Sequence, residues 1–354
     1  MSFKAIILSL FLLFFAFSAF ALENKQTNTD GKIIRKSAFK DGELVSEEKD
    51  QNGDGKIDSW FFYKDGVLVE NIVDKNKDGN ADSWLLYENG KLTQEQRDEN
   101  FDGYTDRWTY FEDGKTTLEV IDENRDENPD IWLFYKDDRL EKKHIDSNFD
   151  GKIDWWIYYQ DGYPTQELRD VNYDGYLDCW LFYKDGQKSW AMADENGDSK
   201  IDVWYKYENG ELASVDRDEN LDGSVDLWET YKDGQLIKRI KDKNNDNEAD
   251  LWEDFQNGFL VKTEIDRNYD GRADKFTYYK QGKIVREDED LNLDGMLDSK
   301  AYYVNEKLFK KEIDENFDGK FDKVFFYKKD KIRKTEKFEE KVEEEGEEEG
   351  NMEF

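Results

Sequence analysis

The sequence predicts an all-β protein built as a tandem array of β-hairpins, and three observations support this fold class. A nine-residue motif, D-x-N-x-D-G-x-x-D in most copies, recurs twelve times at a period of 24 residues without an insertion. An aromatic-rich segment follows each motif, and a dipeptide such as Asp65-Gly66 follows each aromatic segment. Asp, Asn and Gly recur too often in this pattern for a helix of useful length. A repeat of this length indicates a stacked array of identical units.

The motif, which we call the loop, is numbered from 1 at its first aspartate. Positions 1, 3, 5 and 9 are Asp, Asn, Asp and Asp in every copy, and position 6 is Gly except at Glu127, Ser199 and Asn247. These four positions comprise Asp50, Asn52, Asp54, Asp58, Asp74, Asn76, Asp78, Asp82, Asp98, Asn100, Asp102, Asp106, Asp122, Asn124, Asp126, Asp130, Asp146, Asn148, Asp150, Asp154, Asp170, Asn172, Asp174, Asp178, Asp194, Asn196, Asp198, Asp202, Asp218, Asn220, Asp222, Asp226, Asp242, Asn244, Asp246, Asp250, Asp266, Asn268, Asp270, Asp274, Asp290, Asn292, Asp294, Asp298, Asp314, Asn316, Asp318 and Asp322.

The second part of each repeat predicts two strands around a tight turn. Position 11 is Trp in nine copies, position 14 is Tyr or Phe in all twelve, and positions 16 and 17 are mostly Asp-Gly or Asn-Gly. Those dipeptides favour a two-residue type I′ turn, and the aromatic flanks favour strands. A turn at positions 16 and 17 predicts that position 14 pairs with 19 and position 11 with 22. The Trp row and position 14 then lie on opposite faces of the sheet.

Stacked hairpins extend one sheet and bury each other's rings, which a single hairpin in water cannot do. We therefore expect a twisted open sheet or a solenoid-like rod, and the alternative is a closed β-propeller. In either arrangement the loops lie along one edge of the sheet and the turns along the other.

The repeats predict four segments. Residues 1–21 read as a signal peptide, with Lys4, an apolar run from Ala5 to Phe17 and an A-x-A site at residues 19–21. Residues 22–49 hold a degenerate capping repeat, and residues 50–337 hold the twelve loop-and-hairpin repeats. Residues 338–354 form an acidic tail that we expect to be disordered. The mature chain is expected to be exported to the periplasm, cell surface or extracellular space, without a transmembrane segment.

Composition excludes several classes of function. The chain has 52 basic and 86 acidic residues and a net charge of −34, which argues against nucleic acid as a partner because phosphates are repelled. Cys179 is the only cysteine, so the chain has no intrachain disulfide. The single histidine, His144, is expected at the surface of a strand. We expect no enzymatic activity, because the repeats single out no acid–base pair, nucleophile set or phosphate loop.

The loop has the chemistry of a calcium site. Ca²⁺ takes six to eight oxygen ligands, and Asp, Asn and Asp at alternate positions supply three side-chain oxygens. Position 6 turns the chain, the variable position 7 offers its backbone carbonyl, and Asp at position 9 closes the cage. Twelve Ca²⁺ ions would reduce the net charge of −34 to −10. Magnesium fits less well because it prefers fewer carboxylates. The alternative is that the aspartates only form turns.

The loop 50–58, D-Q-N-G-D-G-K-I-D, resembles the first nine positions of an EF-hand calcium loop. Position 12 is Phe61 rather than the EF-hand glutamate and strands flank the loop, so it is more similar to the calcium loops of FG-GAP and integrin-type repeats. The hairpin part, W-x-x-Y-x-D-G-x-L, resembles MORN-type and YwqK-type repeats. This resemblance implies calcium as the ligand of the loop residues.

Two functions follow as expectations. The first is an exported calcium-binding repeat protein with a structural or adhesive role, in which calcium rigidifies a β rod and a surface protein or polysaccharide is the partner. The alternative is a carbohydrate- or cell-wall-binding module that uses the Trp and Tyr rows. Core packing is the competing explanation for the Trp row.

Overall fold

The computed structural model describes residues 22–328 and 331–337, and all of their regular structure is β-strand. The predicted signal peptide, 1–21, and acidic tail, 338–354, lie outside the described residues. The chain divides into two compact units, Met1–Gly175 and Tyr176–Phe354. In the described part of the chain no helix has the length and hydropathy needed to cross a bilayer.

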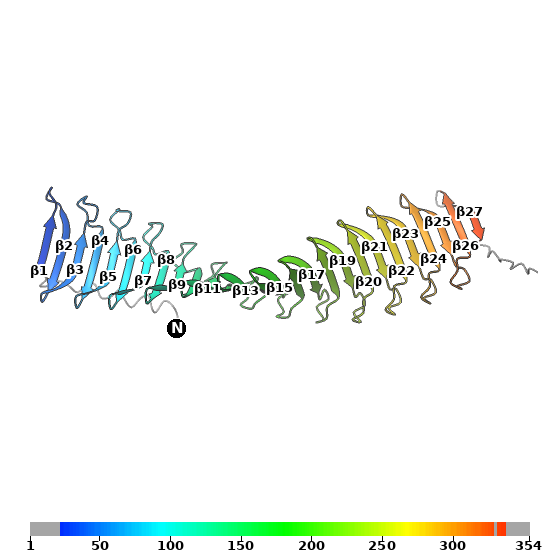
Figure 1. The fold of residues 1–354 in the computed structure, drawn as a ribbon, viewed down its shortest axis with the longest axis horizontal. Helices are drawn as coiled ribbons and strands as arrows, with labels where there is room; N and C mark the ends of the chain where they lie inside the picture. The colour runs from blue at the N-terminus through cyan, green and yellow to red at the C-terminus, as the bar shows by residue number, and fades with distance from the viewer. Residues whose placement is uncertain (1–21, 329–330, 338–354) are drawn as a thin grey trace, which may run out of the picture. The chain divides into compact units, whose positions relative to one another are not determined.

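The first unit contains thirteen strands in chain order (Figure 1). They are β1 (Leu22–Thr27), β2 (Ile33–Lys40), β3 (Glu43–Lys49), β4 (Ser59–Lys64), β5 (Val67–Val73), β6 (Ser83–Glu88), β7 (Lys91–Arg97), β8 (Arg107–Glu112), β9 (Lys115–Ile121), β10 (Ile131–Lys136), β11 (Arg139–Ile145), β12 (Trp155–Gln160) and β13 (Tyr163–Arg169).

The second unit contains fourteen strands. They are β14 (Cys179–Lys184), β15 (Gln187–Ala193), β16 (Val203–Glu208), β17 (Glu211–Arg217), β18 (Leu227–Lys232), β19 (Gln235–Lys241), β20 (Leu251–Gln256), β21 (Phe259–Ile265), β22 (Lys275–Lys280), β23 (Lys283–Glu289), β24 (Ser299–Val304), β25 (Lys307–Ile313), β26 (Lys323–Lys328) and β27 (Lys331–Lys337).

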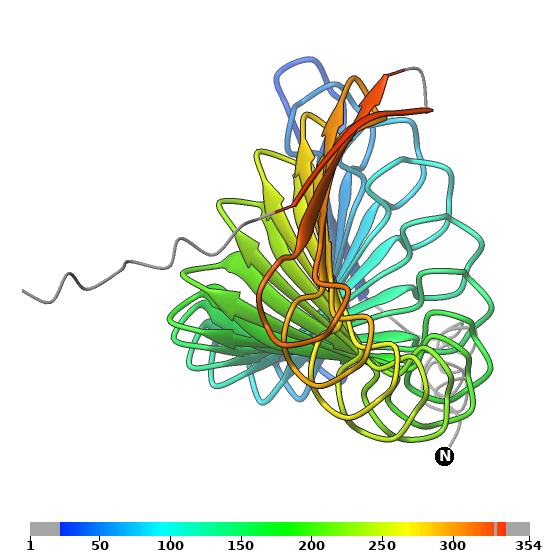
Figure 2. The same cartoon turned by 90° about the vertical axis from the view of Figure 1, so that its right-hand side faces the viewer.

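Within each unit every strand pairs antiparallel with its neighbours in chain order, from β1 to β13 and from β14 to β27. Among the described residues the first and last strands of a unit do not pair with each other, so each unit is an open sheet and not a closed propeller. The strand direction turns progressively from hairpin to hairpin within a unit (Figure 2). The sequence prediction of a twisted, open hairpin array is confirmed.

The hairpin turns explain the register. Asp65 and Gly66 have φ angles of 53° and 74°, which is the type I′ conformation, and Tyr63 pairs with Leu68 as predicted. The predicted pairing of position 11 with 22 is wrong, because Trp60 pairs with Ile72 at position 23. A β-bulge after the turn inserts one extra residue into the returning strand and shifts the rest of the ladder by one. The same register shift occurs in the other hairpins; in β8–β9 it lies between Tyr110 and Phe111 and leaves Thr117 as the extra residue of the returning strand.

The core is thin because every described element within a unit belongs to the sheet, so no second layer covers either face. Buried apolar side chains are few, as at Val120, Val203 and Val215. The Trp side chains at position 11 are half-buried. The most consistently buried side chains are instead the outer aspartates of the loops. The loops therefore supply much of the buried side-chain structure of the protein.

Candidate metal centre in the loops

The loops are fixed to the sheet by two backbone hydrogen bonds that recur along the chain. The position 1 N–H donates to the position 9 carbonyl of the preceding loop, as from Asp98 N to Asp82 O at 2.8 Å. The position 9 N–H donates to the last residue of the preceding strand, as from Asp106 N to Arg97 O at 2.8 Å. Each loop therefore begins and ends on the ladder of the sheet, and consecutive loops are joined through their backbones.

The outer aspartates, at positions 1 and 9, are buried and turned into their own loop. Twenty-three of these twenty-four side chains are buried, and Asp322 is intermediate. In all twelve loops Oδ2 of position 1 accepts the position 6 N–H, as from Gly103 to Asp98 at 2.7 Å. Asp106 Oδ2 accepts the N–H groups of Glu99 and Asn100 at 2.7 and 3.1 Å. A buried carboxylate requires such partners, because its desolvation is otherwise uncompensated.

The inner residues, at positions 3 and 5, form a second set of turns nearer to solvent. In every loop the Asn Oδ1 accepts the position 5 N–H, as from Asp102 to Asn100 at 2.8 Å. Asp102 Oδ1 in turn accepts the Tyr104 N–H at 2.9 Å. All twelve position 5 aspartates are exposed. The four predicted ligand residues of a loop therefore each close a turn in the backbone.

The loop backbone enters the left-handed region at two positions. Position 6 was predicted to do so, and even its three non-glycine residues, Glu127, Ser199 and Asn247, have φ angles of 68–70°. Position 4 also has positive φ in all twelve loops, and sequence reasoning missed it. Ten of these residues are not glycine, and their φ angles lie between 60° and 67°. Several are large side chains, such as Phe101, Phe149 and Tyr269, whose preference for negative φ gives no signal for this conformation.

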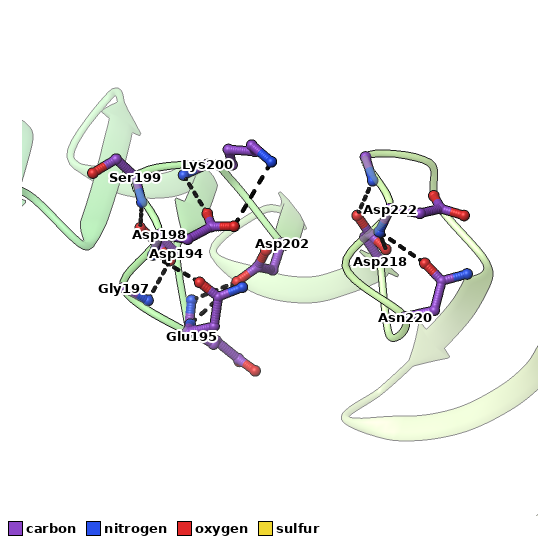
Figure 3. Close-up of polar contacts among 12 residues, drawn as sticks. Asp194, Glu195, Gly197, Asp198, Ser199, Lys200, Asp202, Asp218, Asn220 and Asp222 are labelled. Carbon is purple, nitrogen blue, oxygen red and sulfur yellow. Dashed lines mark hydrogen bonds and ion pairs between the residues drawn. The ribbon is translucent and has the colours of Figure 1, made fainter.

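One loop brings its carboxylates together. Carboxylate oxygens of Asp194, Asp198 and Asp202 lie within 4.8 Å of one another (Figure 3). Within residues 22–328 and 331–337 this is the one cluster of three potential metal-ligating side chains of this kind. The charge of Asp198 is opposed only partly, by Lys200 Nζ at 3.8 Å from Oδ2. Three carboxylates this close repel one another unless a cation lies between them.

The other loops hold the same residue types in a different side-chain arrangement. In eight of them the Asn Nδ2 donates to Oδ2 of the position 5 aspartate, as from Asn76 to Asp78 at 3.0 Å. That hydrogen bond turns the position 5 carboxylate towards an amide nitrogen. Among the described residues, the other loops carry the predicted ligand types but lack the close carboxylate group of loop 194–202.

The donor set of loop 194–202 fits a hard cation such as Ca²⁺. Its side chains offer carboxylate and amide oxygens and neither imidazole nor thiolate, which are the ligands that zinc prefers. Asp194 Oδ1 accepts the Gly197 N–H at 2.7 Å and Oδ2 accepts the Ser199 N–H at 2.6 Å. Each carboxylate oxygen has two lone pairs, so these bonds leave capacity for a cation.

Burial and hydrogen bonding shift the pKa values of the loop carboxyl groups in opposite directions. Burial raises the pKa of Asp130 and of Asp226 above the usual range, against the lowering effect of their backbone N–H partners. The backbone N–H of position 7 lowers the pKa of the exposed Asp54, Asp78 and Asp126. The lowered pKa values favour the charged form of these three aspartates, which lie at the exposed mouth of their loops.

Two ring-bearing side chains outside the loops, His144 and Trp190, have defined surroundings. His144 was expected at the surface but is half-buried on β11, where its ring lies 4.9 Å from that of Phe134 and Nε2 lacks a hydrogen-bond partner. In the second unit Trp190 is 40% exposed and stacks on Phe182 with ring centroids 3.9 Å apart and an interplanar angle of 7°. Trp190 lies outside the predicted Trp row, so the row alone could not have identified this stacked pair.

No family model and no curated protein matches this chain. Among solved structures it is similar to a chain of accessory secretory protein 1,2 and 3 of Streptococcus pneumoniae, at 12% identity and a TM-score of 0.23, over 29% of this chain and 19% of that one. It is also similar to a chain of the TcdB2-TccC3-Cdc42 structure, at 10% identity and a TM-score of 0.19, over 81% and 18% of the two chains. A third match is the Tc holotoxin pore of Photorhabdus luminescens, at 12% identity, a TM-score of 0.18, and 82% and 17% coverage.

The chain spans less than a fifth of the length of these three chains. TM-scores this low do not indicate a shared fold, so these matches say nothing about the fold or function of this chain. The case for a function therefore depends on the loops themselves.

Proposed function

We propose that this is an exported calcium-binding repeat protein with a structural or adhesive role. The observation that carries the proposal is the carboxylate group of Asp194, Asp198 and Asp202, within 4.8 Å of one another in one loop. The same residue types recur in twelve loops, so up to twelve sites of one design are proposed. Where an Asn amide now donates to the position 5 carboxylate, a bound cation would take the place of that hydrogen bond.

Calcium would stabilise the array through its loops. A ligand that binds only the folded protein stabilises it by RT ln(1 + [L]/Kd) for each site. Extracellular calcium modules bind at about 10⁻⁴ to 10⁻³ M, so millimolar calcium outside a cell would occupy sites of that affinity. Each loop joins two consecutive hairpins, and binding at a loop would therefore stiffen the connection between them. The proposal assigns no catalytic role to the loop carboxylates, because each one repeats in every unit.

The test removes one exposed candidate ligand of the loop and leaves the hydrogen bonds of the β-sheet unchanged. Asp198→Asn keeps the size of a side chain that is exposed and hydrogen-bonded only within its loop. We expect calcium to slow amide exchange of residues 194–202 in the parent protein, and this protection to require about tenfold more calcium in the variant, since one charged ligand is lost. Hydrogen exchange with mass spectrometry measures both.

Asp185→Asn is the matched control, since it removes the same charge from an exposed turn residue whose φ of 51° suits Asn equally well. Its calcium dependence should equal that of the parent. Equal calcium dependence of the Asp198 variant and the control would contradict a site in this loop.

A carbohydrate partner is the second candidate, and the stacked pair of Phe182 and Trp190 favours it. An exposed aromatic face can stack on a sugar ring, and Trp190 is 40% exposed. Trp190→Ala should abolish retention on an immobilised polysaccharide if this pair is the binding platform, whereas retention equal to that of the parent would exclude it.

A further inference from the structure

The dipeptide Asn-Gly occurs five times in the chain and in two structural settings. Two copies, at 52–53 and 196–197, occupy positions 3 and 4 of their loops. The other three, at 89–90, 209–210 and 257–258, form hairpin turns. In an unfolded chain Asn followed by Gly readily loses its amide, because the glycine nitrogen meets no side chain as it attacks the amide carbon. The fold decides whether this reaction can occur.

The loop setting holds both reacting groups in hydrogen bonds. Gly197 N–H donates to Oδ1 of the buried Asp194 at 2.7 Å, and Asn196 Oδ1 accepts the Asp198 N–H at 2.7 Å. In loop 50–58 the same two hydrogen bonds are 2.6 and 2.8 Å long. The glycine nitrogen can approach the amide carbon only after both bonds break, and one of them ends on a charged carboxylate. The loop geometry therefore opposes deamidation.

The turn setting leaves the same groups unrestrained. Asn209 and Gly210 have φ angles of 53° and 82°, and the strand residues on either side pair with each other. The ladder of a two-residue turn uses those flanking residues, so the Gly210 N–H is not part of it. Among the described residues neither this N–H nor the exposed Asn209 side chain has a hydrogen-bond partner. The turns at 89–90 and 257–258 have the same conformation and likewise lack such partners.

We propose that Asn89, Asn209 and Asn257 are sites of spontaneous deamidation in the folded protein, and that the loops protect Asn52 and Asn196 from the same reaction. In the first step the glycine nitrogen forms a bond to the asparagine Cγ, and the bond from Cγ to Nδ2 breaks. The amide leaves as ammonia and takes the glycine proton, which leaves a cyclic succinimide. Water then adds to either ring carbonyl and opens the ring to Asp or isoaspartate. Water is the only co-reactant.

The proposal also gives a reason for the strain at position 4. Ten loops carry a residue other than glycine there, with φ between 60° and 67°, although glycine would relieve the strain. A side chain after Asn hinders the attack of the backbone nitrogen, so these loops protect the amide of position 3 in a second way. Deamidation in a turn adds a negative charge, and isoaspartate lengthens the backbone of the turn by a methylene. Ageing of the protein therefore begins at the turns and leaves the position 3 amides intact, whether or not calcium is bound.

Two nearly identical segments of the second unit test the proposal. Residues 195–198 are Glu-Asn-Gly-Asp in a loop, and residues 208–211 are Glu-Asn-Gly-Glu in a turn. The predicted mature chain, residues 22–354, is incubated at mildly alkaline pH in calcium buffer and in chelator. Peptide mapping by mass spectrometry follows Asn, Asp and isoaspartate at each site. Asn209 should deamidate at least about tenfold faster than Asn196 in both buffers, because two hydrogen bonds must break in the loop.

The denatured chain is the control. In concentrated urea the two asparagines should react at equal rates, since their sequence neighbours are almost the same. The pair Asn52 and Asn89 repeats the comparison in the first unit. Equal rates for loop and turn in the folded protein would overturn the proposal, as would a difference that persists in urea. A difference that vanishes in chelator while the β signal in circular dichroism remains would assign the protection to calcium and overturn the role of the hydrogen bonds.

Discussion

At the scale of single residues, the loop is defined by its backbone angles as much as by its ligands. Position 6 takes φ angles near 70° even in the three copies without glycine. A non-glycine residue in this region costs roughly 1 kcal/mol relative to glycine. Loops that lack the glycine should therefore close around a cation at a cost that the other loops do not have.

Replacement of Glu127, whose φ is 70°, by Gly should strengthen calcium binding in loop 122–130. Relief of about 1 kcal/mol of strain corresponds to roughly a fivefold gain in affinity. Calcium-dependent amide protection of this loop measures the change. Asn128→Gly, one residue along and without positive φ, is the control and should give no gain. No difference between the two variants would count against the loop geometry.

A tyrosine at position 14, Tyr135, makes a pH-dependent contribution to the stability of the fold. Burial and the hydrogen bond from the Tyr135 hydroxyl to Glu119, at 3.0 Å, raise the pKa of Tyr135 to about 12. The folded pKa is above the unfolded value of 10.0, so the contribution to stability is fully present below pH 10. It is lost as pH rises through about 12.

Tyr135→Phe should therefore lower the free energy of unfolding by about 1 kcal/mol at pH 8, the net value of one hydrogen bond. As the pH rises from 10 towards 12 the difference from the parent should shrink and then reverse, because the tyrosine ionises more readily in the unfolded chain. Denaturant unfolding at the two pH values measures it, with Tyr163→Phe, at an exposed residue, as the control. A difference that is unchanged between the two pH values would contradict this role of the hydroxyl.

At the scale of elements, the turn and the bulge together determine the register of the two strands in each hairpin. The Asp-Gly dipeptides allowed the type I′ turn and the pairing of positions 14 and 19 to be predicted. The bulge after the turn could not be predicted, because the residues at position 20, such as Val69 and Thr117, carry no special conformational preference. Its effect was to shift the predicted partner of the Trp row by one residue.

The turn prediction is tested at Gly114, where φ is 81° and an added Cβ would meet open space. Gly114→Ala should therefore destabilise the β8–β9 hairpin through backbone strain alone, by about 1 kcal/mol. Amide exchange of residues 107–121 measures this. Asp113→Asn keeps the turn and loses only the exposed ion pair with Lys91, so its effect should stay below about 0.5 kcal/mol. Equal effects would contradict a strained turn.

At the scale of the whole molecule, the period predicted a tandem hairpin array, with an open sheet expected and a closed propeller as the alternative; the open sheet is the arrangement observed within each unit. The 24-residue spacing fixed the number of strands in the twelve repeats, which is the number observed from β4 to β27. The additional strand β1 was not predicted, because Leu22–Thr27 has no aromatic pattern or turn dipeptide. The absence of a second layer within a unit could not be predicted either, since alternate apolar residues on both faces are equally compatible with a layered core.

The candidate site was predictable in its residues but not in its arrangement. The spacing identified the four side chains of each loop, and the structure turns all four towards the loop backbone. It brings three carboxylates together only at Asp194, Asp198 and Asp202 among the described residues. In eight of the other loops the Asn amide donates to the neighbouring aspartate. Side-chain rotations of this kind cannot be predicted from a repeat whose ligand residues do not change.

The central claim is that calcium binds the loops and stabilises the array. The most direct measurement is a calcium titration of the mature chain, residues 22–354, followed by circular dichroism and thermal unfolding, with equilibrium dialysis for stoichiometry and magnesium as control. We predict several calcium ions per chain, up to twelve, and an unfolding temperature that rises with calcium alone. No bound calcium, or an equal response to magnesium, would contradict the claim and leave the aspartates as turn-forming residues.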